Sequence, residues 1–127
     1  MTFPITGARL RTILERGVSE GAVGKGAYLQ VSGLKYSWDR SKPSGSRIVG
    51  NVTTTDGKVI GPNDTIRLSF NVYPACEGGD GYTVPEAKAA CDARGSAPKA
   101  VDLVMKHITT TLGGRVAPPA AGRVNRM

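Results

Sequence analysis

Apolar residues near the start of the chain recur at helical spacing and predict an amphipathic helix over residues 6–18. Its predicted buried face is formed by Leu10, Ile13, Leu14 and Val18. Thr6 is a suitable N-cap, because a threonine hydroxyl accepts a hydrogen bond from a backbone amide of the first turn. The glycine-rich residues 19–26 predict a loop after this helix.

A second helix is predicted over residues 97–112, with Pro98 in its first turn. Gly113 and Gly114 follow it and are expected to end it. The single histidine, His107, lies beside the apolar stripe, so we expect a surface or boundary side chain. The apolar stripe itself consists of Val101, Val104, Met105, Ile108 and Leu112.

Alternating apolar and polar residues between the two helices predict strands. The alternation is clearest in residues 65–72, where every second side chain is apolar. Residues 47–54 predict another strand, and Asp56-Gly57 is typical of a hairpin turn that leads into a short return strand at residues 59–60.

The remaining segments are less regular. Residues 27–38 are rich in β-branched and aromatic side chains and predict two strand segments separated by a bend at Gly33. Residues 86–95 predict a short helical turn, and the tail predicts at most one short strand, at Val116 or Val124. The order helix, strands, helix indicates an α+β fold, a mixed-sheet sandwich packed with two main helices.

A length of 127 residues indicates a single domain over residues 1–127. Apolar residues make up 39% of the chain and charged residues 21%, as in a globular protein. No apolar run approaches the roughly 20 residues that a membrane helix needs, so we expect no membrane span. The first residues do not resemble a signal peptide and read as the continuation of a longer chain.

The net charge of +7 is spread along the chain without a basic run. Such a distribution indicates a solvated surface, so no nucleic-acid partner is expected. One histidine and two cysteines are too few for a zinc site with four Cys or His ligands, or for a two-metal hydrolase site. We therefore expect neither a metal site nor catalytic residues in this chain.

The two cysteines, Cys76 and Cys91, have two interpretations. In an oxidising compartment they can form a disulfide, which stabilises by about 3 kcal/mol for a loop of this length in the chain-entropy model. In a reducing compartment they are small core residues. The sequence leaves both open.

The most unusual segment is the loop from Tyr73 to Tyr82, which places three glycines around the carboxylate of Asp80. Glycines let the backbone approach a ligand closely, and a carboxylate accepts hydrogen bonds from vicinal hydroxyls such as those of ribose. The two flanking tyrosines can stack on a planar base. The alternative is a tight turn in which Asp80 caps its own backbone.

Several segments in this order resemble the C-terminal domain of the 5'-nucleotidase family, which includes UDP-sugar hydrolases and 2',3'-cyclic phosphodiesterases. They are ITGARLRTILERGV, YLQVSGLKYSWD, KPSGSRI, DGKVIGPNDTIRLS and GGDGY, followed by DLVMKHI and GGRVAPPAAGRV. The similarity covers nearly the whole chain, and the combination of LQVSG with GGDG at this spacing is its most specific part.

The resemblance implies roles for the loop residues. Asp80 is expected to hold the ribose hydroxyls, and Tyr73 to replace the family's base-stacking phenylalanine, whose usual position is Pro74 here. The expected substrate-binding residues are Tyr73, Gly78, Gly79, Asp80 and Tyr82, with Gly81 helping to shape the loop. The family's second stacking ring falls at or before the first residue, so it is missing or reduced to Phe3.

The resemblance also implies that catalysis and substrate recognition belong to separate domains. In the family, an N-terminal domain with two divalent metal ions hydrolyses the phosphoester, and the C-terminal domain recognises base and ribose. We therefore expect a substrate-binding domain that is inactive alone, with a nucleoside or nucleotide and the catalytic domain as partners, from a periplasmic, secreted or cell-surface parent. The alternative is a non-catalytic interaction or scaffold domain that retains the fold.

Overall fold

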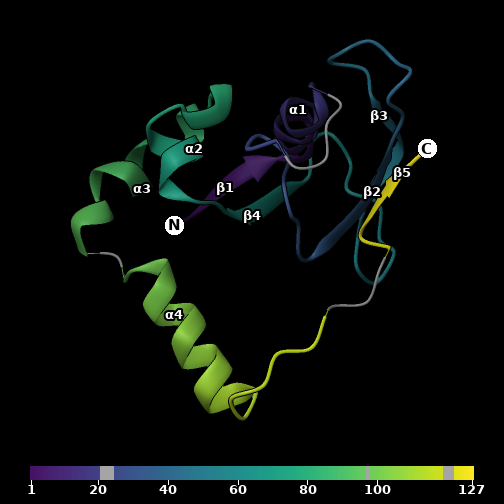
Figure 1. The fold of residues 1–127 in the computed structure, drawn as a ribbon. Coiled ribbons are helices and arrows are strands. Elements are labelled where there is room, and N and C mark those ends of the chain that lie inside the picture. The colour runs from purple at the N-terminus through teal and green to yellow at the C-terminus, as the bar shows by residue number, and fades with distance from the viewer. Residues whose placement is uncertain (21–24, 97, 119–121) are drawn as a thin grey trace.

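The structure is a computed structural model that describes residues 1–20, 25–96, 98–118 and 122–127. Two small sheets and several helices make up the fold, which confirms the predicted α+β class (Figure 1). None of the helices in these ranges is long and apolar enough to cross a membrane.

Helix α1, Gly7–Val18, lies between the two sheets and contacts β1 of one and β3 of the other (Figure 1). Thr6 caps it as predicted, because its Oγ1 accepts a hydrogen bond from the amide of Arg9 at 3.3 Å. Its inward face carries the predicted residues Leu10, Ile13, Leu14 and Val18, all buried. Burial of four such side chains, at about 1.5–3 kcal/mol each, makes this helix the centre of the core.

The first sheet pairs β1, Thr2–Thr6, antiparallel with β4, Thr65–Ser69. The register places Phe3 opposite Leu68 and Ile5 opposite Ile66. Strand β4 confirms the start of the predicted strand, which ends three residues earlier than expected. Strand β1 was not predicted, because it contains Pro4 and its partner lies far away in the sequence.

The second sheet has β2, Leu34–Trp38, between β3, Ile48–Thr54, and β5, Val124–Arg126. Strand β3 is antiparallel to β2, with an irregularity between Lys35 and Ser37, whereas β5 is parallel to β2. The tail strand therefore forms at Val124.

Two strand predictions are wrong in part. The first segment of residues 27–38 makes no strand, and only the second becomes β2 after the bend at Gly33, where φ is 83°. Tyr28 and Leu29 pack against the core as partly buried side chains without belonging to a strand, which accounts for the apolar character of this segment. The return strand at residues 59–60 is a single bridge between Val59 and Thr53.

The segment after β4 is more helical than predicted. The expected loop at residues 73–83 contains helix α2, Val72–Cys76, and a 3₁₀ turn, Gly79–Gly81. The predicted helical turn at residues 86–95 forms as a 3₁₀ turn at Pro85–Ala87, helix α3 at Lys88–Asp92 and a further turn at Arg94–Ser96. This chain of short helices lies beside β1 and β4 (Figure 1).

Helix α4, Ala100–Lys106, continues as a π-helical turn, His107–Thr111, and stands away from the two sheets (Figure 1). The predicted second helix is thus confirmed from residue 100 to residue 111. Pro98, expected in its first turn, precedes the helix, and residue 97 lies outside the described residues. Its apolar stripe faces solvent, with Val101 61% exposed and Val104 56% exposed.

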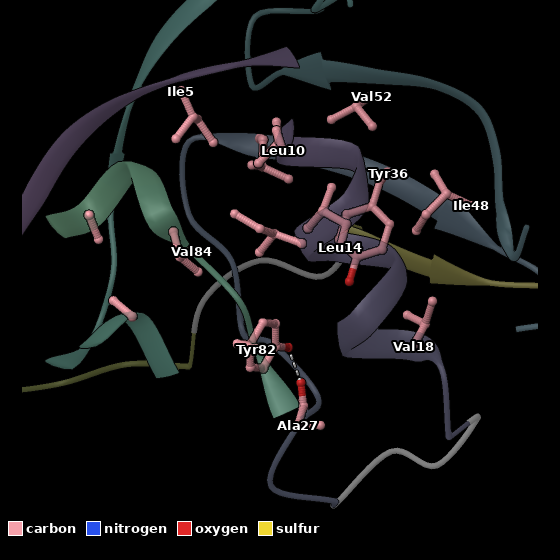
Figure 2. Close-up of a cluster of buried hydrophobic side chains, with 14 of the residues drawn as sticks. Ile5, Leu10, Leu14, Val18, Ala27, Tyr36, Ile48, Val52, Tyr82 and Val84 are labelled. Carbon is pink, nitrogen blue, oxygen red and sulfur yellow. Dashed lines mark hydrogen bonds between the residues drawn. The ribbon is translucent and has the colours of Figure 1, made fainter. Parts of the chain in front are cut away.

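The core fills the space between α1 and the sheets, and it includes Tyr36 of β2 and Tyr82 of the segment after the glycine-rich turn (Figure 2). Trp38 is fully buried and Tyr36 almost so. Burial raises the pKa of the Tyr36 hydroxyl far above its usual value, so this group stays neutral. Neither the Tyr36 hydroxyl nor the Trp38 Nε1 has a hydrogen-bond partner among the described residues.

Candidate functional site

An open cavity of about 650 Å³ lies beside the glycine-rich loop. Three of the predicted site residues, Tyr73, Asp80 and Tyr82, line it together. Further walls come from the start of β1, from residues 26–30 and from the end of β4. The topology therefore gathers these three residues at one hollow in the surface, whereas Gly78 and Gly79 are not part of its lining.

Tyr73 lies flat against the backbone of Gly79. A side chain at residue 79 would overlap the ring carbons of Tyr73, so only glycine leaves room for the ring there. Gly79 is buried, whereas Tyr73 remains 56% exposed and lines the cavity. One side of the ring is thus supported by backbone, and the rest stays accessible, as a stacking surface requires.

Left-handed backbone conformations shape the loop. Gly78 and Gly81 have φ values of 66° and 73°, which glycine adopts without steric cost. Between them, Asp80 has φ 54° and ψ 23°, and it is the one non-glycine residue of the described chain with positive φ. Such a conformation is uncommon outside glycine and costs roughly 1–2 kcal/mol.

Backbone groups close this turn without help from the Asp80 side chain. The amide of Gly81 donates to the carbonyl of Gly78 at 3.1 Å, and that of Tyr82 donates to the carbonyl of Gly79 at 3.2 Å. The Asp80 carboxylate makes no hydrogen bond or ion pair with any described residue, so the capping alternative does not describe this turn. A Cβ at Gly26 would lie 2.8 Å from Asp80 Oδ1, so this glycine leaves space around the carboxylate.

Tyr82 belongs to the core as much as to the cavity. It is only 4% exposed, its hydroxyl donates to the carbonyl of Ala27, and its ring meets Phe70 edge to face at 5.4 Å (Figure 2). Burial raises the pKa of this hydroxyl far above its usual value. The ring supports the cavity floor and anchors the end of the loop to residue 27.

A disulfide joins Cys76 at the end of α2 to Cys91 in α3, with the two Cα atoms 5.7 Å apart. Of the two interpretations left open by the sequence, pairing is the one found. Cys76 lies three residues after Tyr73 on the same short helix, so the cross-link ties the helix that carries the ring to its neighbour.

Phe3 does not lie in the cavity. It is 3% exposed and packs in the core through β1, so of the two alternatives for the second stacking ring, missing or reduced to Phe3, the structure does not support Phe3. Sequence reasoning also missed other residues that line the cavity, among them the half-buried Tyr28 and Leu103 of α4. The β-branched and aromatic side chains around Tyr28 indicated a strand, and the predicted stripe on α4 omitted Leu103, so neither pointed to a site.

Candidate metal ligands do not gather anywhere in residues 1–20, 25–96, 98–118 and 122–127, where no group of three or more His, Cys, Asp or Glu side chains has metal-site geometry. His107 is exposed at the end of α4, in agreement with its predicted surface position.

Comparison with known proteins identifies the family. A model of the 5'-nucleotidase C-terminal domain matches residues 1–87. The chain is 30% identical over 127 residues to the trifunctional nucleotide phosphoesterase protein YfkN of Bacillus subtilis, covering 97% of this chain and 8% of that protein. It is 32% identical over 126 residues to a snake venom 5'-nucleotidase of Gloydius brevicauda, covering 94% and 21%.

Solved structures agree. The 5'-nucleotidase precursor from Thermus thermophilus superposes with a TM-score of 0.73 at 27% identity, covering 99% of this chain and 24% of that one. The chain therefore belongs to the 5'-nucleotidase C-terminal domain family, as the resemblance of its segments indicated. It spans less than a quarter of the length of each of these three proteins.

Proposed function

We propose that this chain is the substrate-recognition domain of a 5'-nucleotidase-like hydrolase and binds the nucleoside part of a nucleotide. The observation that carries the proposal is the shared cavity of Tyr73 and Asp80. The supported ring of Tyr73 offers an apolar face to a base, and the carboxylate of Asp80 offers two acceptor oxygens to the vicinal hydroxyls of a ribose. Gly78 and Gly79 shape the loop, and Tyr82 holds its far end.

The dimensions and chemistry of the cavity support a nucleoside. A volume of about 650 Å³ lies within the range of small-molecule sites. Half-exposed aromatic and apolar side chains, together with a carboxylate without a described partner, match a ligand with a flat base and a polar sugar.

The test is a titration of the purified chain with adenosine, adenine and 2',3'-dideoxyadenosine, followed by NMR shifts of Gly79, Asp80 and Tyr82. We expect weak, millimolar binding of adenosine. Asp80→Asn should remove the preference for adenosine over the dideoxy compound, and Tyr73→Ala should weaken all three ligands roughly tenfold, through lost stacking. Asp92→Asn, on the exposed side of α3, is the matched control. Unchanged shifts at millimolar adenosine would contradict the proposal.

We also propose that bond cleavage takes place on another domain of the parent protein, which holds two divalent metal ions. A single histidine and two disulfide-bonded cysteines leave this chain without the ligands of a two-metal site. Binding of the nucleoside end would then orient the phosphate toward those ions. Metal-dependent release of phosphate from AMP by the 127-residue chain alone would contradict this division.

The disulfide supports an exported parent, since such bonds persist in oxidising compartments. Relatives from snake venom agree with a periplasmic, secreted or cell-surface location. Fractionation of cells that express the parent, with thiol labelling of Cys76 and Cys91, tests the assignment. Quantitative labelling of both thiols in the native compartment would contradict it.

The second candidate is a non-catalytic interaction or scaffold domain that retains the fold. The observation that favours it is the solvent-facing apolar stripe of α4, where Val101, Val104 and Met105 are more than half exposed. An Asp80→Ala substitution in the parent enzyme discriminates the two. An unchanged Michaelis constant favours the scaffold, whereas a raised one favours recognition.

A further inference from the structure

Arg16 of α1 supports the glycine-rich loop from behind. Its Nε donates to the backbone carbonyl of Asp80 at 2.7 Å, across 64 positions of sequence. Its Nη1 donates to the Ser19 hydroxyl at 2.9 Å, and its Nη2 lies 3.5 Å from the Glu20 carboxylate. The Ser19 hydroxyl in turn donates to the carbonyl of Arg16 at 2.8 Å. The guanidinium is therefore held in place by its own helix end and presents one N–H to the loop.

The loop needs such support, because the backbone of Asp80 is in the left-handed region. No side chain among the described residues bonds the Asp80 carboxylate, so its direction depends on the backbone to which it is attached. A hydrogen bond from a charged donor to the carbonyl of the same residue is stronger than one between neutral groups. Arg16 thus fixes the peptide that determines where the Asp80 side chain points.

Gly81 and Arg16 fit each other. A Cβ at residue 81 would lie 2.7 Å from Arg16 Nη2 and 3.0 Å from its Nε, so no side chain has room there. The guanidinium rests on the bare backbone of Gly81, immediately after the carbonyl to which it donates. Gly81 is thus required both for its φ of 73° and for the approach of Arg16.

The loop separates Arg16 from the ligand cavity. The large cavity is lined by Asp80 and Tyr73 but not by Arg16. A smaller cavity of about 160 Å³ is lined by Arg16 and Gly81 but not by Asp80. Arg16 therefore contacts the loop outside the lining of the large cavity.

From this geometry we propose that Arg16 is a positioning residue that holds the Asp80 carboxylate toward vicinal hydroxyls and thereby determines selectivity for a ribose. The inference rests on the proposed function of the cavity. It assigns the selectivity for the sugar to a residue of α1 that lies outside the cavity, and it leaves the affinity for the base with Tyr73.

The test compares dissociation constants for adenosine, 2',3'-dideoxyadenosine and adenine in the full 127-residue chain. In Arg16→Met we expect the preference for adenosine over the dideoxy compound to fall roughly tenfold, as for loss of a charge-assisted hydrogen bond. Adenine, which has no sugar, should bind within about twofold of the original chain, a result that a merely structural defect would not produce.

Arg11→Met is the matched control. Arg11 is also on α1 and its guanidinium also donates to backbone carbonyls, those of Ile48 at 2.6 Å and Gly50 at 3.0 Å, but it does not contact the loop. We expect this variant to keep the full preference for adenosine. Arg16→Lys, which keeps the charge and most of the stem, should retain part of the preference, and it decides the question if Arg16→Met does not fold.

Three outcomes overturn the inference. The first is an unchanged preference for adenosine over the dideoxy compound in both Arg16 variants. The second is a fall in adenine affinity in Arg16→Met as large as the fall in adenosine affinity. The third is a loss of the preference in Arg11→Met as large as that in Arg16→Met. If the unmodified chain binds adenine and adenosine alike and shows no preference over the dideoxy compound, the proposed function of Asp80 itself fails. The two failures are therefore distinguishable, because the first appears only in the variants and the second appears in the original protein.

Discussion

The carboxylate of Glu15 accepts a hydrogen bond from the backbone amide of Ile48 at 2.8 Å, in the buried seam between α1 and the start of β3. Its second oxygen accepts from the amide of Arg47 at 2.9 Å. Glu15 is only 8% exposed. One side chain of the central helix therefore accepts hydrogen bonds from two backbone amides where β3 begins. Without Glu15, these amides would lack hydrogen-bond partners.

Replacing Glu15 by Gln should destabilise the fold by about 1–3 kcal/mol. A glutamine keeps one acceptor oxygen and places an NH₂ group against the second amide, so one buried donor loses its partner. Urea denaturation followed by circular dichroism measures the change. Glu77→Gln is the control, since Glu77 is exposed and lies 3.9 Å from Arg94, and it should shift the midpoint little. Equal effects of the two substitutions would refute this role for Glu15.

Replacing Gly79 by Ala should abolish base stacking while leaving most of the stability intact. The new methyl group would occupy the place of the Tyr73 ring, which can move because it is half exposed. We expect adenine affinity to fall roughly tenfold, as for loss of one stacked base. Gly95→Ala is the control, because nothing lies within 4 Å of a Cβ there. Binding of adenine by Gly79→Ala at the original strength would contradict the role of the Tyr73 ring as a stacking surface.

Replacing both cysteines by Ser should lower the free energy of unfolding by about 3 kcal/mol in the chain-entropy model, for a separation of 15 residues. Chemical denaturation with and without a dithiol reductant gives the measurement. The original chain should lose stability on reduction, and the Cys76→Ser/Cys91→Ser variant should not respond. A reductant effect of equal size in the variant would show that another process is being observed.

Stability should depend on acid pH through Glu86. Arg9 donates to both carboxylate oxygens of Glu86, at 2.6 and 3.3 Å, and this hydrogen bonding holds the pKa of Glu86 below its usual value near 4.5. Because the folded pKa is the lower one, the pair stabilises the fold above the unfolded pKa. That contribution is lost as the pH falls through the folded pKa.

Thermal unfolding across this acid range measures the effect, which we expect to be about 0.5–1 kcal/mol for a partly exposed pair. Glu86→Gln should be less stable than the original chain at neutral pH, and the difference should vanish in acid. Arg9→Met should show the same acid-dependent part together with a loss that persists in acid, because Arg9 also donates to the carbonyl of Thr83 at 2.9 Å. A difference that persists unchanged in acid would mean that the carboxylate charge contributes nothing.

Local patterns were sufficient for α1 and for the start of β4. The N-cap, the spacing of Leu10 and Leu14, and the alternation of Ile66 and Leu68 act over a few neighbouring residues, and the structure confirms what they predict. The loop with Asp80 was also visible, because three glycines around one carboxylate are a strong local signal.

Features that depend on distant partners were not predictable. Strand β1 exists because β4 pairs with it, and Pro4 argues against a strand when read alone. Helix α2 forms although Pro74 lies at its centre, and a disulfide to α3 holds it in place. Arg16 looked like any charged residue on the polar side of a helix, because the carbonyl that it bonds lies 64 positions away.

The parallel pairing of β2 with β5 has a consequence for synthesis on the ribosome. Tyr36 lies opposite Val124, so one edge of β2 stays unpaired until residues 124–126 have been synthesised. A nascent chain that already carries Trp38 must wait for Arg126, whose guanidinium covers the indole at 5.7 Å. This sheet is therefore completed late relative to the synthesis of its central strand, and variants that lack residues 124–126 will expose the unpaired edge of β2 to other chains.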